Sequence, residues 1–457
     1  MARTAKNETV LTPEEKLAQA LVPVAEQPYQ VPENWCWVYL SGILSEIKNG
    51  TTIKQDKSGE GYSVTRIESL QNQTIDFDRL GSIVDESAIK EADWYAAGDI
   101  ALSHINSAEH VGKTALITEG MLPLVHGMNL LRLRFIDALL PILFQYYSQS
   151  FQYKEAILAR INMAVNQVSI NQRQIGSIEF PLPPLAEQQR IVDRIESLFA
   201  KLDEAKEKAQ AVVDGVEDRK AAILHKAFTG ELTADWRNTH GVAIDDWENS
   251  PLETVFQLRS GSTIDASEEQ EYGAIPYVKV ADMNLPENEI QITTSSRFVD
   301  ECPESHVIPR GSTIFPKRGG AILTNKKRYV GVEKIIADLN TMAIMPIVGR
   351  AYGWYGYYWM QSVDLRQLNN GSNVPQINNK DMVKLFVPTP SIDEQKAIVG
   401  ILDSVFDKEI EAKETAEKVI DQIDTMKKSI LARAFRGELG TNDPADESAE
   451  ELLKRVL

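Results

Sequence analysis

Apolar and small residues recur at alternating steps of four and three in two long segments of the chain. The positions are Ile191, Ile195, Leu198, Leu202, Ala205, Ala209, Val212, Val216, Ile223 and Ala227 in the first segment, and Ile398, Leu402, Val405, Ala412, Ala416, Val419, Ile423, Met426, Ile430 and Ala434 in the second. This heptad spacing predicts one helix of about 40 residues, roughly 60 Å long, in each segment. Each helix has one apolar stripe to bury. We therefore expect an antiparallel coiled coil within one chain.

The two helical segments belong to a longer repeat. Residues 170–232 align with residues 377–439 without a gap, 207 positions apart, and 26 of the 63 pairs are identical. The shared landmarks include Glu187-Gln188 with Glu394-Gln395, and Phe228-X-Gly230 with Phe435-X-Gly437. This period is far too long for a solenoid and indicates two copies of one large module. A homodimer would need only one copy of the apolar stripe, so the repeat favours pairing within the chain.

Each repeat follows a body of less regular sequence, in which short β-branched runs alternate with Gly, Asn and Pro. The pattern predicts an α+β protein with two similar mixed α/β domains separated by the two long helices. The expected parts are an N-terminal arm with a short helix (1–31), the first domain (32–169), the first helical region (170–244), the second domain (245–376), the second helical region (377–440) and an acidic C-terminal tail with a short helix (441–457). Weaker matches link the two bodies, namely Gly98-Asp99-Ile100 with Gly311-Ser312-Thr313-Ile314, and Tyr146-Tyr147 with Tyr357-Tyr358.

The chain is acidic, with a formal net charge of −18 over 457 residues. This charge argues against non-specific coating of DNA but leaves room for a local basic surface. Between residues 310 and 334 the sequence has seven Lys or Arg and one acid, Glu333. Taken alone, this basic cluster fits a DNA contact and an ordinary solvated hairpin equally well.

Cysteine usage and hydropathy favour a reducing cytoplasm. Cys36 and Cys302 are the only cysteines, so neither a disulfide framework nor a multi-thiolate zinc site is expected. The sequence begins without an apolar leader, and the most apolar stretch, residues 135–147, is too short and too interrupted to span a bilayer. We therefore expect a cytoplasmic protein with no membrane partner.

Motifs of catalysis are missing from the chain. A methyltransferase that acts on exocyclic amines needs an Asn/Asp-Pro-Pro-Tyr/Phe motif, and none is present. The segment 110–114 resembles part of a P-loop, but Ser107 stands where the first glycine belongs. His104 and His110 lack a cysteine or acidic partner at metal-ligand spacing, so no metal site is expected.

Three features together resemble the specificity subunits of type I restriction-modification systems. The first is the duplicated pair Pro-Leu-Pro-Pro-Leu-Ala-Glu-Gln (181–188) and Pro-Thr-Pro-Ser-Ile-Asp-Glu-Gln (388–395), each followed by a long heptad helix. The second is Ala-Phe-X-Gly-Glu-Leu, which ends both helical segments. The third is the opening Val31-Pro32-Glu33-Asn34-Trp35. Any one of these features is common, but their double occurrence is specific, and the resemblance covers nearly the whole chain.

This resemblance implies a non-catalytic subunit that recognises double-stranded DNA. Each body would be a target recognition domain that reads one half of an asymmetric, two-part sequence. The repeated helices would set the distance between the half-sites and dock two methyltransferase subunits, with two restriction subunits in a larger complex. The adenine methyl donor, S-adenosylmethionine, is then expected in the methyltransferase partners, and no cofactor is expected on this chain.

With the resemblance, the basic residues become candidates for contact with phosphates or guanine. In the second domain the candidates are Lys279, Lys317, Arg318, Lys326, Lys327 and Arg328. In the first domain, which has no such basic run, they are Arg66, His104, Asn106 and Lys113. Glu187, Gln188, Glu394, Gln395, Phe228 and Phe435 are candidates for the spacer and for docking of the methyltransferase. For the two glutamates, a structural role at a helix N-terminus comes first.

A rival hypothesis is a non-catalytic scaffold, with two protein-binding bodies on a coiled-coil spacer. The net charge of −18 favours this rival over a DNA-binding protein. Enrichment of a split DNA motif from a random library, with and without the methyltransferase, would separate the two hypotheses.

Overall fold

The computed structural model describes residues 12–56, 59–164, 167–368 and 375–457, so residues 1–11 of the expected N-terminal arm (1–31) lie outside the described residues. The chain divides into two compact units. The first unit contains residues 1–208 and 418–457, and the second contains residues 209–417. The C-terminal segment is therefore part of the unit that holds the first domain.

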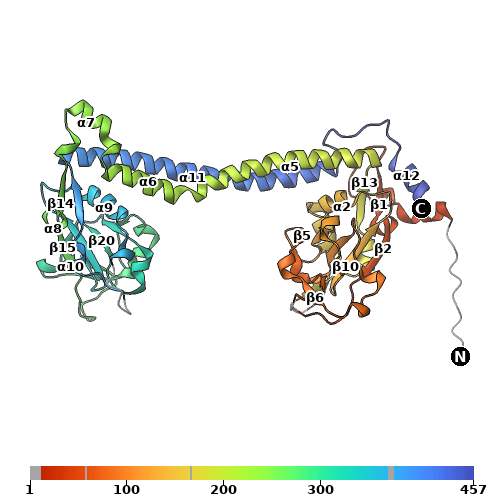
Figure 1. Ribbon diagram of the computed structural model, residues 1–457, viewed down its shortest axis with the longest axis horizontal. Helices are drawn as coiled ribbons and strands as arrows, with labels where there is room; N and C mark the ends of the chain where they lie inside the picture. Colours follow the sequence, from red (N-terminus) through yellow and green to blue (C-terminus); the bar gives the residue numbers. More distant parts are fainter. Residues whose placement is uncertain (1–11, 57–58, 165–166, 369–374) are drawn as a thin grey trace. The chain divides into compact units, whose positions relative to one another are not determined.

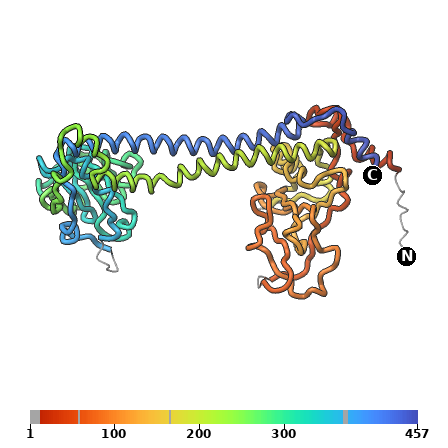
Figure 2. Tube along the Cα trace, turned by 45° about the horizontal axis from the view of Figure 1, so that its top comes forward, coloured from red at the N-terminus to blue at the C-terminus, as the bar shows by residue number. Residues whose placement is uncertain are grey.

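The long helices pair in an antiparallel manner, as the heptad pattern predicts. They are α5 (Leu185–Asp214), α6 (Val216–Phe228) and α11 (Ile392–Ala434). In the first unit, Lys206 Nζ of α5 lies 2.8 Å from Asp424 Oδ1 of α11. In the second unit, Arg219 Nε of α6 lies 2.8 Å from Glu409 Oε2 of α11. Residue numbers rise along one helix as they fall along the other, and both ribbon and trace show the helices side by side (Figures 1 and 2).

The first helical segment is interrupted, which corrects the prediction of one helix of about 40 residues there. Gly215 separates α5 from α6 and has ψ near 0°. The Val212 carbonyl accepts a hydrogen bond from Arg219 Nη2 at 2.8 Å, which satisfies an acceptor at the interruption. The heptad pattern does not reveal this interruption, because the apolar residues Val212 and Val216 on either side of it are still four residues apart. The second segment has no glycine there and forms one helix of 43 residues.

The first domain is built on a four-stranded antiparallel sheet (Figure 1). Its order is β2 (Leu44–Asn49), β10 (Leu130–Phe135), β7 (Ile100–Ser103), β9 (Thr114–Leu116). The smaller sheets are β1 (Cys36–Tyr39) with β13 (Glu179–Leu182), β3 (Tyr62–Val64) with β6 (Gly81–Ile83), β4 (Leu70–Gln71) with β5 (Thr74–Ile75), and β11 (Asn162–Ala164) with β12 (Gln167–Ser169) and β8 (Ile105–Asn106). The helices are α1 (Pro13–Ala20), α2 (Pro141–Tyr147), α3 (Phe151–Leu158), α4 (Gln172–Gly176) and α12 (Ala449–Val456).

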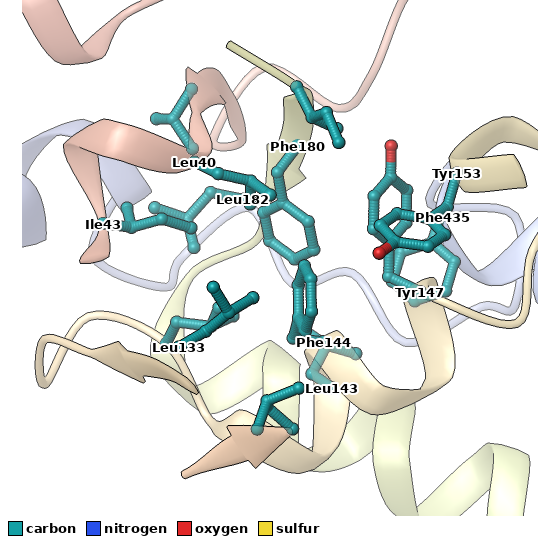
Figure 3. Packing of buried hydrophobic residues seen from close by; sticks show 14 of the residues in the cluster. Leu40, Ile43, Leu133, Leu143, Phe144, Tyr147, Tyr153, Phe180, Leu182 and Phe435 are labelled. Atoms are coloured by element: carbon teal, nitrogen blue, oxygen red, sulfur yellow. The ribbon is translucent and has the colours of Figure 1, made fainter. Parts of the chain in front are cut away.

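Residues from the end of the chain complete the core of the first domain. Phe435, which follows α11, is fully buried, and its ring centroid lies 5.0 Å from that of Tyr147 (Figure 3). Leu452 and Leu453 of α12 belong to the same apolar cluster. The expected short helix in the acidic tail is confirmed, but it is packed into a core rather than free in solvent.

The second domain repeats this framework with a fifth strand in the main sheet and with a four-stranded second sheet. Its main sheet has the order β15 (Phe256–Ser260), β23 (Thr341–Pro346), β20 (Thr313–Pro316), β21 (Arg328–Val330), β17 (Gln291–Ile292). A second sheet has the order β18 (Phe298–Val299), β16 (Ile275–Val278), β22 (Lys334–Ala337), β19 (Ile308–Pro309), and β14 (Glu248–Pro251) pairs with β24 (Phe386–Thr389). The helices are α7 (Ala234–His240), α8 (Leu252–Val255), α9 (Gly353–Ser362) and α10 (Asn379–Met382).

Matching hydrogen bonds fix the correspondence between the two domains. The N–H of Ile170 donates to the carbonyl of His104 at 2.9 Å, and the N–H of Ile377 donates to that of Lys317 at the same distance. Gly98 and Gly311 precede β7 and β20 and have φ of 91° and 90°, a left-handed conformation that favours glycine. The predicted similarity of the two bodies is therefore confirmed at the level of strand register.

The match of Tyr146-Tyr147 with Tyr357-Tyr358 is wrong by one residue. The ring of Tyr146 packs on Phe199 of α5, and the ring of Tyr358 packs on Phe406 of α11, with centroid distances of 6.0 Å and 5.6 Å. Phe199 and Phe406 occupy the same position of the repeat, so Tyr146 corresponds to Tyr358. Tyr147 then corresponds to Trp359, so only one tyrosine of each pair is equivalent.

We expect Phe435→Ala to destabilise the first domain by about 3–5 kcal/mol, because it leaves a large cavity in a closed core. Phe228→Ala is the matched control at the equivalent position of the repeat, and it should cost less because Phe228 is partly exposed. Hydrogen exchange of the β7 and β10 amides measures the first effect. Equal loss of protection at β7 and β10 in both variants would contradict this assignment.

Candidate nucleic-acid interface

Most candidate DNA-contacting side chains lie on one connection in each domain. In the first domain the β7–β9 connection comprises residues 104–113, and in the second the β20–β21 connection comprises residues 317–327. The strands that they join correspond, because Ile100 pairs with Leu116 in the first sheet and Thr313 pairs with Tyr329 in the second. The first domain has no basic run in its sequence, but the fold shows that its β7–β9 connection occupies the position of the β20–β21 connection.

On the β7–β9 connection, Lys113 is the exposed cation among the candidates. His104 is half-buried, and burial lowers the pKa of its imidazole, so this side chain is neutral at pH 7. Asn106 is engaged locally: its Nδ2 donates to Ser103 Oγ at 3.2 Å, and its Oδ1 accepts from the Ser107 N–H at 2.9 Å. The connection therefore presents mostly neutral polar groups.

On the β20–β21 connection, Arg318 is exposed and Lys317 is half-buried. Burial, and next the charge of Arg318, lower the pKa of Lys317. The backbone of Arg318 forms a β-bridge with Gln376, which holds the start of the connection in place. Within the described part of the chain, the guanidinium of Arg318 has no ion pair, so it is available to a phosphate or a guanine.

Of the three consecutive basic residues 326–328, Lys327 is the one that is fully buried. Lys327 is 1% exposed, and its ammonium donates to Val363 O at 2.7 Å and to Asn325 Oδ1 at 2.8 Å. Arg328 is half-buried, and its Nη2 donates to Met283 O at 3.0 Å. Lys326 donates to the side chain of Asn284. Lys327 is therefore removed as a DNA contact, because its charge is not accessible.

Two further candidates are already paired within their own domains. Lys279 Nζ lies 2.6 Å from Glu269 Oε2 and over the ring of Tyr277. Arg66 Nε lies 2.9 Å from Glu68 Oε1. A phosphate would have to compete with these carboxylates, which makes Lys279 and Arg66 weaker candidates than Arg318.

The structure contradicts the docking role predicted for Glu394, which is fully buried at the start of α11. Its carboxylate accepts from Trp247 Nε1 at 2.9 Å, from Thr233 Oγ1 at 2.8 Å and from Arg237 Nη1 at 2.9 Å. Trp247 belongs to the second domain, whereas Thr233 and Arg237 follow α6. The expected structural role at a helix N-terminus is confirmed.

Glu187, at the start of α5, is also fully buried and in an equivalent arrangement. Its carboxylate accepts from Trp35 Nε1 at 2.6 Å, from Thr441 Oγ1 at 3.1 Å and from Asn442 Nδ2 at 2.8 Å. Trp35 opens the first domain, and the other two donors follow α11. Glu187 is thus unavailable to a partner subunit, and its docking role is corrected as well.

The adjacent glutamines brace the same helix starts. Gln188 accepts from the Leu140 N–H at 2.8 Å and donates to Ala138 O at 2.8 Å. Gln395 accepts from the Tyr352 N–H at 2.8 Å and donates to a backbone carbonyl as its counterpart does. Both side chains are fully buried, and so is Phe435, whereas Phe228 packs half-buried against Tyr355. Gln188, Gln395 and Phe435 are therefore excluded as docking residues.

The tryptophan partners of the glutamates were missed at the level of sequence. A usable signal was present, because Trp35 and Trp247 each open a body ahead of its repeat.

No group of three or more His, Cys, Asp or Glu that could hold a metal ion occurs among the described residues. No helix in the same residues is long and apolar enough to cross a membrane.

Lys327 makes stability depend on pH. Burial lowers the pKa of its ammonium from 10.5 to about 7. Between about pH 7 and 10 the unfolded chain binds this proton more strongly than the folded chain, so the free energy of unfolding rises with pH in that window. We expect wild type to gain stability relative to Lys327→Met when urea unfolding is compared at about pH 7.5 and 9.5. An exposed lysine variant, Lys396→Met, should show no such change of relative stability with pH. If the stability difference between wild type and Lys327→Met is the same at both pH values, the ammonium of Lys327 is not buried as described.

Comparison with known proteins agrees with this architecture. The family model described as the type I restriction modification DNA specificity domain matches residues 32–213 and 244–422. A Methanocaldococcus jannaschii protein, provisionally named the MjaX specificity subunit of a type I restriction enzyme, is 28% identical over 90% of this chain and 95% of its own length. The EcoKI specificity subunit of Escherichia coli K12 is 24% identical over 90% of both chains.

Two solved structures share the fold. The HsdS subunit from Thermoanaerobacter tengcongensis has a TM-score of 0.64 at 17% identity, over 91% of this chain and 100% of that chain. A chain from a structure on complex assembly and conformational transition of the type I R-M system has a TM-score of 0.65 at 16% identity, over 90% and 100%. The duplicated family match spans both domains and most of both long helices. The chain therefore belongs to the specificity subunits of type I restriction-modification systems.

Proposed function

We propose that each domain reads one half of an asymmetric, two-part DNA sequence. One observation carries this proposal: the two domains share a strand framework but present different side chains on corresponding connections. The β7–β9 connection offers Asn106 and Lys113, and the β20–β21 connection offers Lys317 and Arg318. Two identical readers would select a palindrome, whereas two different readers select two different half-sites.

The acidic chain then needs partners to hold DNA. Few exposed cations lie on the two connections, and the net charge of −18 opposes binding to phosphates. We propose that two methyltransferase subunits supply most of the phosphate contacts and carry S-adenosylmethionine for adenine methylation. Two restriction subunits would join the same complex to cut unmodified DNA. In this scheme the present chain selects the sequence and carries out no chemical step.

The paired helices are the proposed spacer and docking surface. Because Glu187, Gln188, Glu394 and Gln395 are buried, docking falls to the solvent-facing sides of α5 and α11. Those sides carry charged residues such as Lys208 and Lys413. A helix pair resists changes in length, so it would keep a constant number of base pairs between the half-sites.

The first test is the methylation pattern of the chain with its cognate methyltransferase in a methylation-free host. We expect N6-methyladenine within one split, asymmetric motif of constant spacing. Replacing residues 245–376 with the corresponding domain of another family member should change one half of the motif and leave the other half and the spacing intact. Sequencing that detects N6-methyladenine gives both results.

Absence of new methylation from a stable complex would refute sequence reading and favour the protein-binding scaffold. A palindromic motif would instead contradict the assignment of one half-site to each domain.

Arg318→Ala tests the exposed cation of the second domain. If Arg318 contacts a phosphate, the salt dependence of binding by the methyltransferase complex should fall by about one unit of slope, uniformly across sequences. If it contacts a guanine, selectivity should relax at one base pair, by about 1–3 kcal/mol. Lys113→Ala is the counterpart in the first domain, and Lys384→Ala, at an exposed lysine between α10 and β24, is the control. Unchanged binding and selectivity in Arg318→Ala would remove it from the interface.

A further inference from the structure

A buried polar side chain ends the connection at the same place in both domains. Thr114 follows the β7–β9 connection, and Lys327 ends the β20–β21 connection. The two positions correspond, because Ala115 pairs with Ala101 in the first sheet and Arg328 pairs with Ile314 in the second, and Thr114 and Lys327 directly precede Ala115 and Arg328. Each residue is 1% exposed, so neither side chain is accessible from the surface.

In the first domain, Thr114 is hydrogen-bonded to residues at the C-terminal end of α2. Its hydroxyl lies 3.1 Å from Gln145 Oε1 of α2 and 2.6 Å from Ser148 Oγ, and Ser148 is the C-cap residue of α2. Gln145 also donates to the Thr114 carbonyl at 3.4 Å. The end of the connection is therefore tied to α2 by both side chain and backbone.

In the second domain, Lys327 makes the equivalent tie with different chemistry. Its Nζ donates to the carbonyl of Val363 at 2.7 Å, and Val363 is the C-cap residue of α9. A cation at this end of a helix is favoured by the helix dipole. Asn325 strengthens the tie, because its Oδ1 accepts from both Lys327 Nζ and the Leu365 N–H.

A second tie lies two residues earlier on each connection. Gly112 has φ of 81° and its carbonyl accepts from Tyr153 Oη of α3 at 3.1 Å. Asn325, at the corresponding position, has φ of 54° and bonds to Leu365. The two domains thus use unrelated side chains to hold the same backbone shape against the segment that follows α2 or α9.

We propose that Thr114 and Lys327 are positioning residues for base readout, each acting on the half-site of its own domain. This inference rests on the proposed reading of one half-site by each domain. Hydrogen bonds to base edges require donors held to within about 0.5 Å, and a buried tie at the end of each connection provides that constraint. Neither residue contacts DNA, so its effect is on the placement of residues such as Arg318.

The test compares Thr114→Val with Lys327→Met, each assembled with the cognate methyltransferase. The readout is the methylated fraction of sites with one base changed in either half, relative to the cognate site. We expect Thr114→Val to lower discrimination about tenfold in the half read by the first domain only, and Lys327→Met to do so in the other half only. The domain replacement described above identifies which half belongs to which domain.

Thr114→Ser is the matched rescue, because it keeps the hydroxyl and should restore discrimination. A merely structural role predicts less methylation at all sites with unchanged discrimination, and that result would overturn the proposal. Relaxation of both halves by either variant would overturn it as well. If Lys327→Met does not fold, the isosteric Thr114→Val decides the question alone. A wild-type chain without a split motif would refute the proposed function, and the positioning role with it.

Discussion

The architecture depends on one buried carboxylate at the start of each long helix. Glu394 joins three parts of the chain: the first turn of α11, the tryptophan that opens the second domain, and the segment after α6. Glu187 does the same for α5, the first domain and the segment after α11. Removing a partner from such a group leaves a buried charge without compensation, which costs several kcal/mol. Domain, helix and returning segment are therefore held as one unit at each of these two points.

This constraint explains why the two copies of the repeat resemble each other more closely in sequence than the two domains do. The identical pairs Glu187-Gln188 and Glu394-Gln395 are buried and hydrogen-bonded inside the protein. A substitution at one of these positions would therefore require a matching change in its hydrogen-bond partners. The connections between β7 and β9 and between β20 and β21 carry no such requirement on their outer side chains. Sequence divergence is thus permitted at the surface that we propose to read DNA.

The sequence was sufficient for the helices, the repeat and the family, because heptad spacing and duplicated motifs are local patterns. It was not sufficient for the break at Gly215, where the apolar step continues across the interruption, nor for the one-residue shift at Tyr358. It also made Lys327 a candidate for contact with DNA, although the side chain of Lys327 is buried. A run of basic letters does not reveal which side chains face solvent, since that depends on the turn made by Asn325 and on the carbonyl of Val363.

The return of the chain to its first unit has a consequence for the order of synthesis. The core of the first domain includes Phe435, Leu452 and Leu453, which are translated after the whole of the second unit. The second unit, residues 209–417, is continuous and has all its parts before then. Domains usually complete folding in the order in which they are translated. Here the order is reversed: the part made first keeps an apolar surface uncovered until α12 emerges and packs against it.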